Sequence, residues 1–76
     1  MARIYLLINV LPGKDTSIRD SLRGVRGVTT ADVVTGPYDI VATLEGEDTS
    51  AIYNTIVSKI RKLKGITRTE TFVSLE

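Results

Sequence analysis

The pentapeptide "GKDTS" at residues 13–17 returns almost unchanged as "GEDTS" at residues 46–50. Each copy follows a strand-like apolar run, and each precedes a run with the apolar spacing of a helix. The matched order continues, because "GVTTADVV" (residues 27–34) and "GITRTETF" (residues 65–72) follow the two helical runs. Two tandem β-α-β units explain this pattern. The sequence therefore predicts an α+β, ferredoxin-like βαββαβ fold, with a four-stranded antiparallel sheet and two helices on one face.

Local residue patterns predict where the strands and helices lie. Four runs rich in alternating or β-branched residues are predicted as strands: Arg3–Leu11, Val28–Thr35, Asp39–Glu45 and Thr67–Leu75. Two apolar stripes with helical spacing lie between them: Ile18, Leu22 and Val25 in the first helix, then Ile52, Ile56, Ile60 and Leu63 in the second. Gly24 and Gly27 are expected to end the first helix and Gly65 the second, because glycine tolerates a left-handed C-cap.

The repeated Asp-Thr pairs supply candidate helix caps. Asp15 or Thr16 is expected to cap the first helix, because either side chain can accept a hydrogen bond from a free N–H group. Asp48 or Thr49 is expected to do the same for the second helix. Since capping explains both aspartates, neither is assigned a catalytic role.

Composition limits both the size of the protein's core and its chemistry. The 76 residues are expected to form one domain over residues 1–76, and a chain of this size buries only about 60% of the surface that its unfolded form exposes. The sequence contains no cysteine and no histidine, so disulfides, thiolate or imidazole metal sites and histidine-dependent catalysis are excluded. We expect no metal and no other cofactor, and we expect partner chains to supply stability.

The charge balance points away from nucleic acids and membranes. The formal net charge is +1, which gives no large field to attract either of them. The basic run "KIRKLKG" (residues 59–65) is better explained by cations near the negative end of a helix than by a phosphate-binding patch. Tyr5 and Asn9 interrupt the first apolar run, so it is neither a signal peptide nor a membrane span. We expect a cytoplasmic protein with no membrane contact and no direct nucleic acid binding.

The first predicted strand is apolar on both of its sides. One face carries Ile4, Leu6, Ile8 and Val10. The other face carries Tyr5, Leu7 and Leu11. A sheet with one solvated face would alternate apolar and polar residues here. Because the helices cover only one face, we expect a second copy of the chain to cover the other and form a homodimer.

The stretch "TGPYDIV" (residues 35–41) is the candidate binding site, and two interpretations of it stay open. In the structural one, the Asp39 side chain bonds to N–H groups of the hairpin and Tyr38 is a surface ring. In the functional one, backbone N–H groups of the turn at Gly36 hold the carboxylate of a free amino acid, Asp39 holds its ammonium group and Tyr38 walls the pocket.

Three features together resemble the effector-binding (RAM) domain of the Lrp/AsnC regulators. These features are the βαββαβ order, the central G-x-Y-D hairpin with Asp48 nine residues after Asp39, and the closing stretch "GITRTETFV" (residues 65–73). The resemblance covers essentially the whole chain. It implies dimers of the α/β barrel type that assemble further into rings such as octamers. It also implies small-molecule effectors, usually amino acids, bound between dimers, and assembly with full-length regulators.

The family pattern carries over to six positions of this chain. In the hairpin, the resemblance implies effector-binding roles for Gly36, Tyr38 and Asp39. In the last strand, it implies the same role for Thr69, Thr71 and Phe72. Full-length members carry an N-terminal helix-turn-helix, whereas this chain begins at its first strand, so it resembles the stand-alone members. The expected function is non-enzymatic: amino acid sensing and oligomerisation in transcription regulation, without a DNA-binding domain of its own.

Two other functions stay open at this point. Small dimeric α+β barrel enzymes of the monooxygenase type share this topology, although the G-x-Y-D loop is not their motif and haem ligation is disfavoured without histidine. A purely structural oligomer, with an empty groove between its dimers, is the second alternative.

Overall fold

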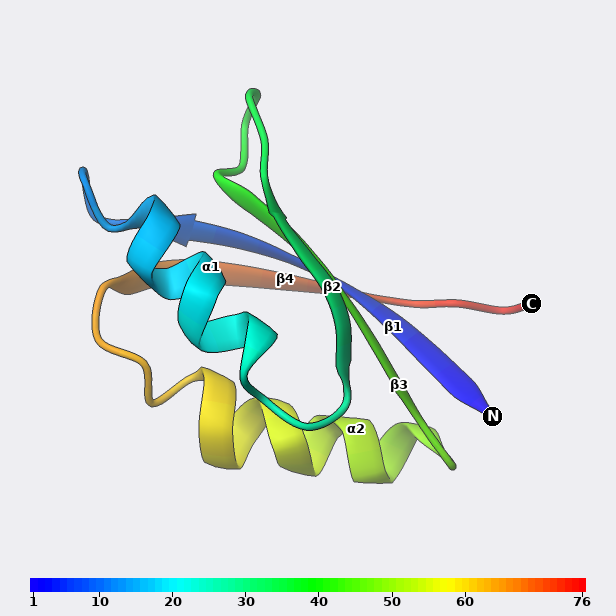
Figure 1. Ribbon diagram of the computed structural model, residues 1–76. Helices are drawn as coiled ribbons and strands as arrows, with labels where there is room; N and C mark the ends of the chain where they lie inside the picture. Colours follow the sequence, from blue (N-terminus) through cyan, green and yellow to red (C-terminus); the bar gives the residue numbers. More distant parts are fainter.

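The chain folds into one antiparallel sheet with both helices on the same side of it (Figure 1). The computed structural model describes residues 1–76. Along the chain lie β1 (Ala2–Val10), α1 (Asp15–Arg23), β2 (Val28–Val33), β3 (Ile40–Gly46), α2 (Thr49–Thr55), the π-helical turn η1 (Ile56–Ile60) and β4 (Ile66–Val73). The strand order is β2-β3-β1-β4, and every neighbouring pair is antiparallel. The predicted ferredoxin-like βαββαβ fold is confirmed.

The core lies between the helices and the sheet and is entirely apolar. The buried residues are Ile4, Leu6, Ile8, Ile18, Leu22, Ala31, Ile40, Ala42, Leu44, Ile52, Ile56 and Ile60. Most residues of the two predicted helical stripes belong to this core. The exceptions are Val25 and Leu63, which are partly buried and pack against it. Burial of one large aliphatic side chain contributes about 1.5–3 kcal/mol, so these residues are the main source of the fold's stability.

The central strand β1 is apolar on both faces, as the alternation predicts. Directly opposite residues of two paired strands point to the same side of the sheet. Buried Leu6 lies opposite buried Ala42, whereas Tyr5 and Leu7 lie opposite Thr43 and Val41 on the other side. This second side carries no helix and is called the open face below. It consists of Tyr5, Leu7, Val41, Thr43, Glu70 and Phe72.

The two repeated Asp-Thr pairs differ in their structural roles. Asp48 is the N-cap of α2, as predicted, and its carboxylate accepts a hydrogen bond of 2.8 Å from the N–H of Ala51. The prediction for α1 was wrong, because Lys14 occupies the N-cap position and Asp15 is already helical. The backbone explains the difference, since Asp48 has the extended φ and ψ of −146° and 171° that capping requires, whereas Lys14 has −100° and 0°.

The helix ends also depart from the predicted ones. Gly24 at the end of α1 has a right-handed φ of −88°, so only Gly27, with a φ of 101°, adopts the left-handed geometry expected of both. The second helix ends in η1, where the N–H of Arg61 donates to the carbonyl of Ile56. Four residues of an α-helix overshoot one turn by about 40°. The π-helical turn η1 is wider, which reduces this angle between the directions of Ile56 and Ile60. Both side chains are fully buried.

All strand ends lie within two residues of the predicted ones, and only the start of β2 at Val28 coincides with its prediction. β2 ends at Val33 rather than Thr35, and β3 begins at Ile40 rather than Asp39. β4 ends at Val73, and Leu75 beyond it is 98% exposed. The shorter β2 and β3 lengthen the connecting hairpin to residues 34–39, which is the segment that carries the candidate site.

Replacement of Asp48 by alanine should lower the free energy of unfolding by about 1 kcal/mol, because the N–H of Ala51 loses its partner. The matched Asp15→Ala variant should cost about 0.5 kcal/mol or less, since the Asp15 carboxylate accepts only an exposed hydrogen bond from the N–H of Thr16, the next residue, and otherwise contributes its charge in the first helical turn. Urea unfolding of both variants at one protein concentration measures the difference. Equal losses would contradict the assignment of Asp48 as the only aspartate cap.

Candidate functional site

The hairpin of residues 34–39 is tied to the end of β1 by three hydrogen bonds. The N–H of Asp39 donates to the carbonyl of Ile8 at 3.0 Å. The side-chain amide of Asn9 donates to the carbonyl of Pro37 at 3.2 Å. The N–H of Val10 donates to Asp39 Oδ2 at 2.9 Å. The hairpin is thus held against the strand by backbone and side-chain groups together.

The Asp39 carboxylate takes the place of a strand partner. Pairing of β1 with β3 ends where Ile8 lies opposite Ile40, two residues before Val10. Without Asp39 the half-buried N–H of Val10 would lose its hydrogen bond, and an unpaired polar group of this kind costs about 1–3 kcal/mol. Asp39 therefore has the structural role that one interpretation of the hairpin gave it. Its second oxygen, Oδ1, accepts no hydrogen bond within the chain.

Gly36 shapes the hairpin through its backbone rather than through close packing. Its φ of 139° lies in the region that residues with a side chain rarely adopt, and no atom lies within 4 Å of where a Cβ would sit. The N–H groups of Gly36 and Tyr38 make no backbone hydrogen bond. The turn therefore offers two free donors beside the Asp39 carboxylate.

Tyr38 is held by two side chains of β4. Its phenol donates a hydrogen bond to the Glu70 carboxylate, and the Arg68 guanidinium carbon lies 5.8 Å from the centre of its ring, within the range of a cation–π contact. The hydrogen bond to Glu70, together with partial burial, raises the pKa of Tyr38 above its ordinary value, and the charge of Arg68 opposes this shift. We call Tyr38, Asp39, Arg68 and Glu70 the hairpin cluster.

Asn9 completes the surroundings of the hairpin cluster. It lies opposite Arg68 in the pairing of β1 with β4, and its Oδ1 atom is buried without a hydrogen-bond partner. Most buried polar atoms in proteins have a partner, so this oxygen can accept a donor from a ligand or from another chain. Asn9 interrupts the apolar side chains that follow Arg3 in β1, and this break was the signal for it in the sequence.

The six residues predicted for effector binding divide between the two sides of the sheet. Tyr38 reaches β4 on the open face, where Phe72 lies opposite Tyr5. Thr69 and Thr71 lie opposite buried residues of β1, so their side chains point to the helix side. One chain alone therefore does not bring all six together. The sequence analysis missed Arg68 and Glu70, the residues that alternate with those threonines and contact Tyr38.

Two further features bear on what the site can hold. No group of three acidic, histidine or cysteine side chains lies close enough together to hold a metal ion. Neither helix is long and apolar enough to cross a membrane. The hairpin cluster itself offers charged side chains, one aromatic ring and backbone N–H groups without a backbone partner.

Comparison with known proteins identifies one family. The family model of the Lrp/AsnC ligand binding domain matches residues 3–76. No curated protein matches the sequence.

Solved structures share the fold across the whole chain. The hypothetical protein PHS023 from Pyrococcus horikoshii is 28% identical, with a TM-score of 0.94 over 100% of this chain and 92% of that one. AsnC of E. coli is 24% identical, with a TM-score of 0.91 over 99% of this chain and 51% of that one. The transcriptional regulator NMB0573 from Neisseria meningitidis, solved as an L-Met complex, is 16% identical, with a TM-score of 0.84 over 99% of this chain and 50% of that one.

The raised pKa of Tyr38 can be measured in a Tyr5→Phe, Tyr53→Phe background, where Tyr38 is the only tyrosine that titrates. The Glu70→Gln substitution should lower this pKa, because glutamine still accepts the hydrogen bond but adds no negative charge beside the phenolate. Ultraviolet absorbance against pH measures the shift, and an identical titration in both proteins would contradict the assigned contact. Since the folded-state pKa is raised, the Tyr38–Glu70 contact stabilises the fold fully below the ordinary phenol pKa. That contribution is lost as the pH rises through the raised value.

Proposed function

Because the chain belongs to the Lrp/AsnC ligand-binding-domain family, we propose that it is a non-enzymatic regulatory module that senses an amino acid and forms oligomers. The observation that carries this proposal is the family match over residues 3–76. The NMB0573 regulator was solved with L-Met, which supports an amino acid as the class of effector. The proposal treats residues 1–76 as one cytoplasmic effector-binding and oligomerisation domain that does not itself contact DNA.

The hairpin cluster has the charges that an amino acid requires. The free Oδ1 of Asp39 would accept a hydrogen bond from the ammonium group. The carboxylate of the amino acid would accept hydrogen bonds from the N–H groups of Gly36 and Tyr38, which have no backbone partner, as oriented backbone N–H groups do for other anions. Arg68 makes no ion pair within the chain, so it adds a positive charge beside the same turn.

The remaining predicted residues would enter the site through assembly. The effector would lie between dimers, where the hairpin and Phe72 of one chain would meet Thr69 and Thr71 of a chain in the neighbouring dimer. No pair of elements involving β4 and a helix packs extensively, so the helix side of this edge strand is available to a neighbouring dimer. This arrangement requires a ring of dimers, such as an octamer, into which full-length regulators of the family could also assemble.

The open face is the proposed dimer interface. Its centre is apolar, and Tyr5 and Phe72 remain 37% and 51% exposed in the single chain. Of the charged groups near the two ends of the face, Arg3 pairs with Glu45 and Glu70 accepts a hydrogen bond from Tyr38, whereas Arg68 makes no ion pair within the chain. Two such sheets can pack face to face at about 10 Å and bury their apolar centres. We therefore propose that a second copy of the chain covers this face.

Thermal shift measurements against the twenty amino acids, with L-Met included, test the proposed effector class. For an amino acid that stabilises the protein, Asp39→Asn should weaken binding about tenfold or more, because a charge-assisted hydrogen bond to the ammonium is lost. The amide oxygen of asparagine can still accept from the N–H of Val10, so stability without ligand should change little.

The Asp39→Ala variant is the matched control for the structural role of this residue. It removes the acceptor as well as the charge, and should lower the free energy of unfolding by about 1–3 kcal/mol. Calorimetry with the three proteins separates the two roles of Asp39. If no amino acid stabilises the wild type, the proposed amino acid sensing is contradicted. If Asp39→Asn binds as well as wild type, Asp39 only supports the hairpin.

Leu7→Lys should dissociate the dimer, because it places an unpaired charge in the centre of the open face, at a cost of several kcal/mol, roughly. Val57→Lys is the control, since Val57 is 54% exposed on the helix side and its substitution should leave the dimer intact. Light scattering at micromolar concentration distinguishes the two. A wild-type protein that is a folded, monodisperse monomer would rule out the proposed interface.

A further inference from the structure

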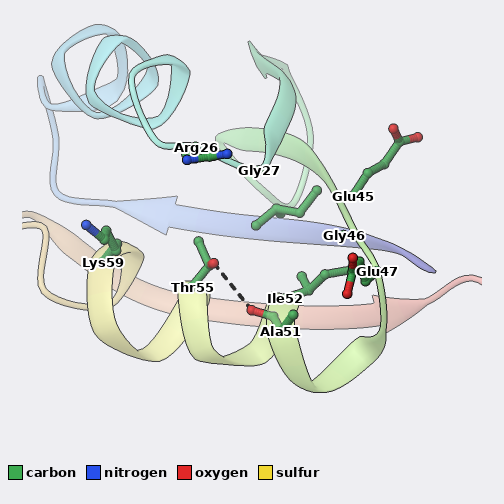
Figure 2. A pocket seen from close by; sticks show the side chains of 10 residues that line it. Arg26, Gly27, Glu45, Gly46, Glu47, Ala51, Ile52, Thr55 and Lys59 are labelled. Carbon is green, nitrogen blue, oxygen red and sulfur yellow. Dashed lines mark hydrogen bonds between the residues drawn. The ribbon is translucent and has the colours of Figure 1, made fainter. Parts of the chain in front are cut away.

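A groove of about 490 Å³ opens on the helix side of the molecule, away from the hairpin cluster (Figure 2). Its walls are the α1–β2 turn, the β3–α2 turn and one flank of helix α2 and the π-helical turn that continues it. The volume lies within the range of about 300–1,000 Å³ that small-molecule sites occupy. The hairpin precedes Ile40, whereas the groove surrounds Gly46, so the two sites lie at opposite ends of β3. Seven residues of extended strand span about 20 Å.

Two glycines line the groove without side chains, and their segments are joined by the hydrogen bond that the N–H of Glu45 donates to the carbonyl of Gly27 at 2.9 Å. Gly27 follows α1 with a φ of 101°, which a residue with a side chain would adopt only under strain. At Gly46 an added Cβ would lie 3.0 Å from Cγ1 of Ile52, so any larger residue would press on the floor of the groove. The floor itself is apolar, because Leu44 and Ile52 lie buried beneath it.

Charged side chains at the rim of the groove lack partners within the chain. Arg26 and Lys59 line it from opposite walls, and neither forms an ion pair or a side-chain hydrogen bond. Glu47 is likewise unpaired, whereas Glu45 is already bound to Arg3 at 3.0 Å. Of the basic residues in the run 59–64, only Lys59 lines the groove.

The charges are separated by sign along the groove. Figure 2 shows Arg26 and Lys59 toward one end and Glu47 toward the other, with Ile52 between them. A ligand of a single charge would satisfy one end and be repelled or left unpaired at the other. A molecule with an anionic group, a short apolar chain and an ammonium group matches the whole groove.

We infer that this groove is a second small-molecule site, which takes an elongated zwitterion. Its carboxylate or phosphate would lie between Arg26 and Lys59, its ammonium would bind Glu47, and its methylene chain would cover Ile52. The groove lies on the helix side, so packing of two open faces against each other leaves it accessible. It is separate from the effector site proposed at the hairpin.

Titration of the ¹⁵N-labelled full chain with ε-aminocaproate, γ-aminobutyrate and glycine tests the site by nuclear magnetic resonance. The two longer zwitterions should shift amide signals of residues 26–27, 45–47 and 51–59, and should bind more tightly than glycine, which is too short to reach both ends. Glutarate and 1,5-diaminopentane carry charges of one sign and should bind at least about tenfold more weakly, because each loses the charge-assisted bonds at one end.

Substitutions at the two ends assign the charges. Arg26→Gln with Lys59→Gln, and separately Glu47→Gln, should each weaken ε-aminocaproate about tenfold or more. All three side chains are exposed, so the fold should survive, which circular dichroism checks. Lys62→Gln is the matched control, since Lys62 belongs to the same basic run but lies outside the groove, and it should bind as wild type does.

The site would be ruled out by any of three results. One is the absence of shifts in the groove up to about 10 mM ligand, far above the concentrations at which a specific small-molecule site should fill. The second is binding that the substitutions at Arg26, Lys59 and Glu47 leave unchanged. The third is a set of shifts confined to residues 36–39 and 68–72, which would support the effector site at the hairpin instead. The groove site and the hairpin site can therefore be contradicted independently of each other.

Discussion

The position of β1 at the centre of the sheet, with apolar side chains on both of its faces, constrains everything else in the molecule. On the helix side, Ile4, Leu6 and Ile8 are fully buried and hold the two helices to the sheet. On the open face, Tyr5 and Leu7 have no such cover. A small chain cannot bury both sides of its sheet with two helices, and dimerisation through the open face is the response that we propose.

The hairpin of residues 34–39 shows how a structural group can also serve binding. Asp39 uses one carboxylate oxygen to satisfy Val10, where the pairing with β3 has ended, and leaves the other oxygen free. The hydrogen bond from the N–H of Val10 to Oδ2 of Asp39 therefore also fixes the position of the free oxygen. A ligand group placed there would meet a carboxylate that needs little reordering, which lowers the entropic cost of binding.

Two sets of unpaired groups lie at opposite ends of β3 and on opposite sides of the sheet. At one end, Asp39 and Arg68 flank the hairpin on the open face; at the other, Arg26, Lys59 and Glu47 rim the groove on the helix side. Dimerisation through the open face would affect the first set directly and leave the second accessible. Since α2 packs on both β1 and β3, a ligand in the groove contacts an element whose position depends on the same sheet.

The sequence by itself determined the order of the elements, their approximate bounds and the two faces of β1, because these follow from local spacing of apolar residues. It could not distinguish Asp15 from Asp48, since identical neighbours adopt different backbone angles according to the turn that precedes each helix. Nor could it show that Tyr38 meets Glu70 across 32 residues. That contact depends on the register of β4 against β1, which is set by pairing between distant strands, and a shift of one residue would have turned Thr69 or Thr71 toward the ring instead.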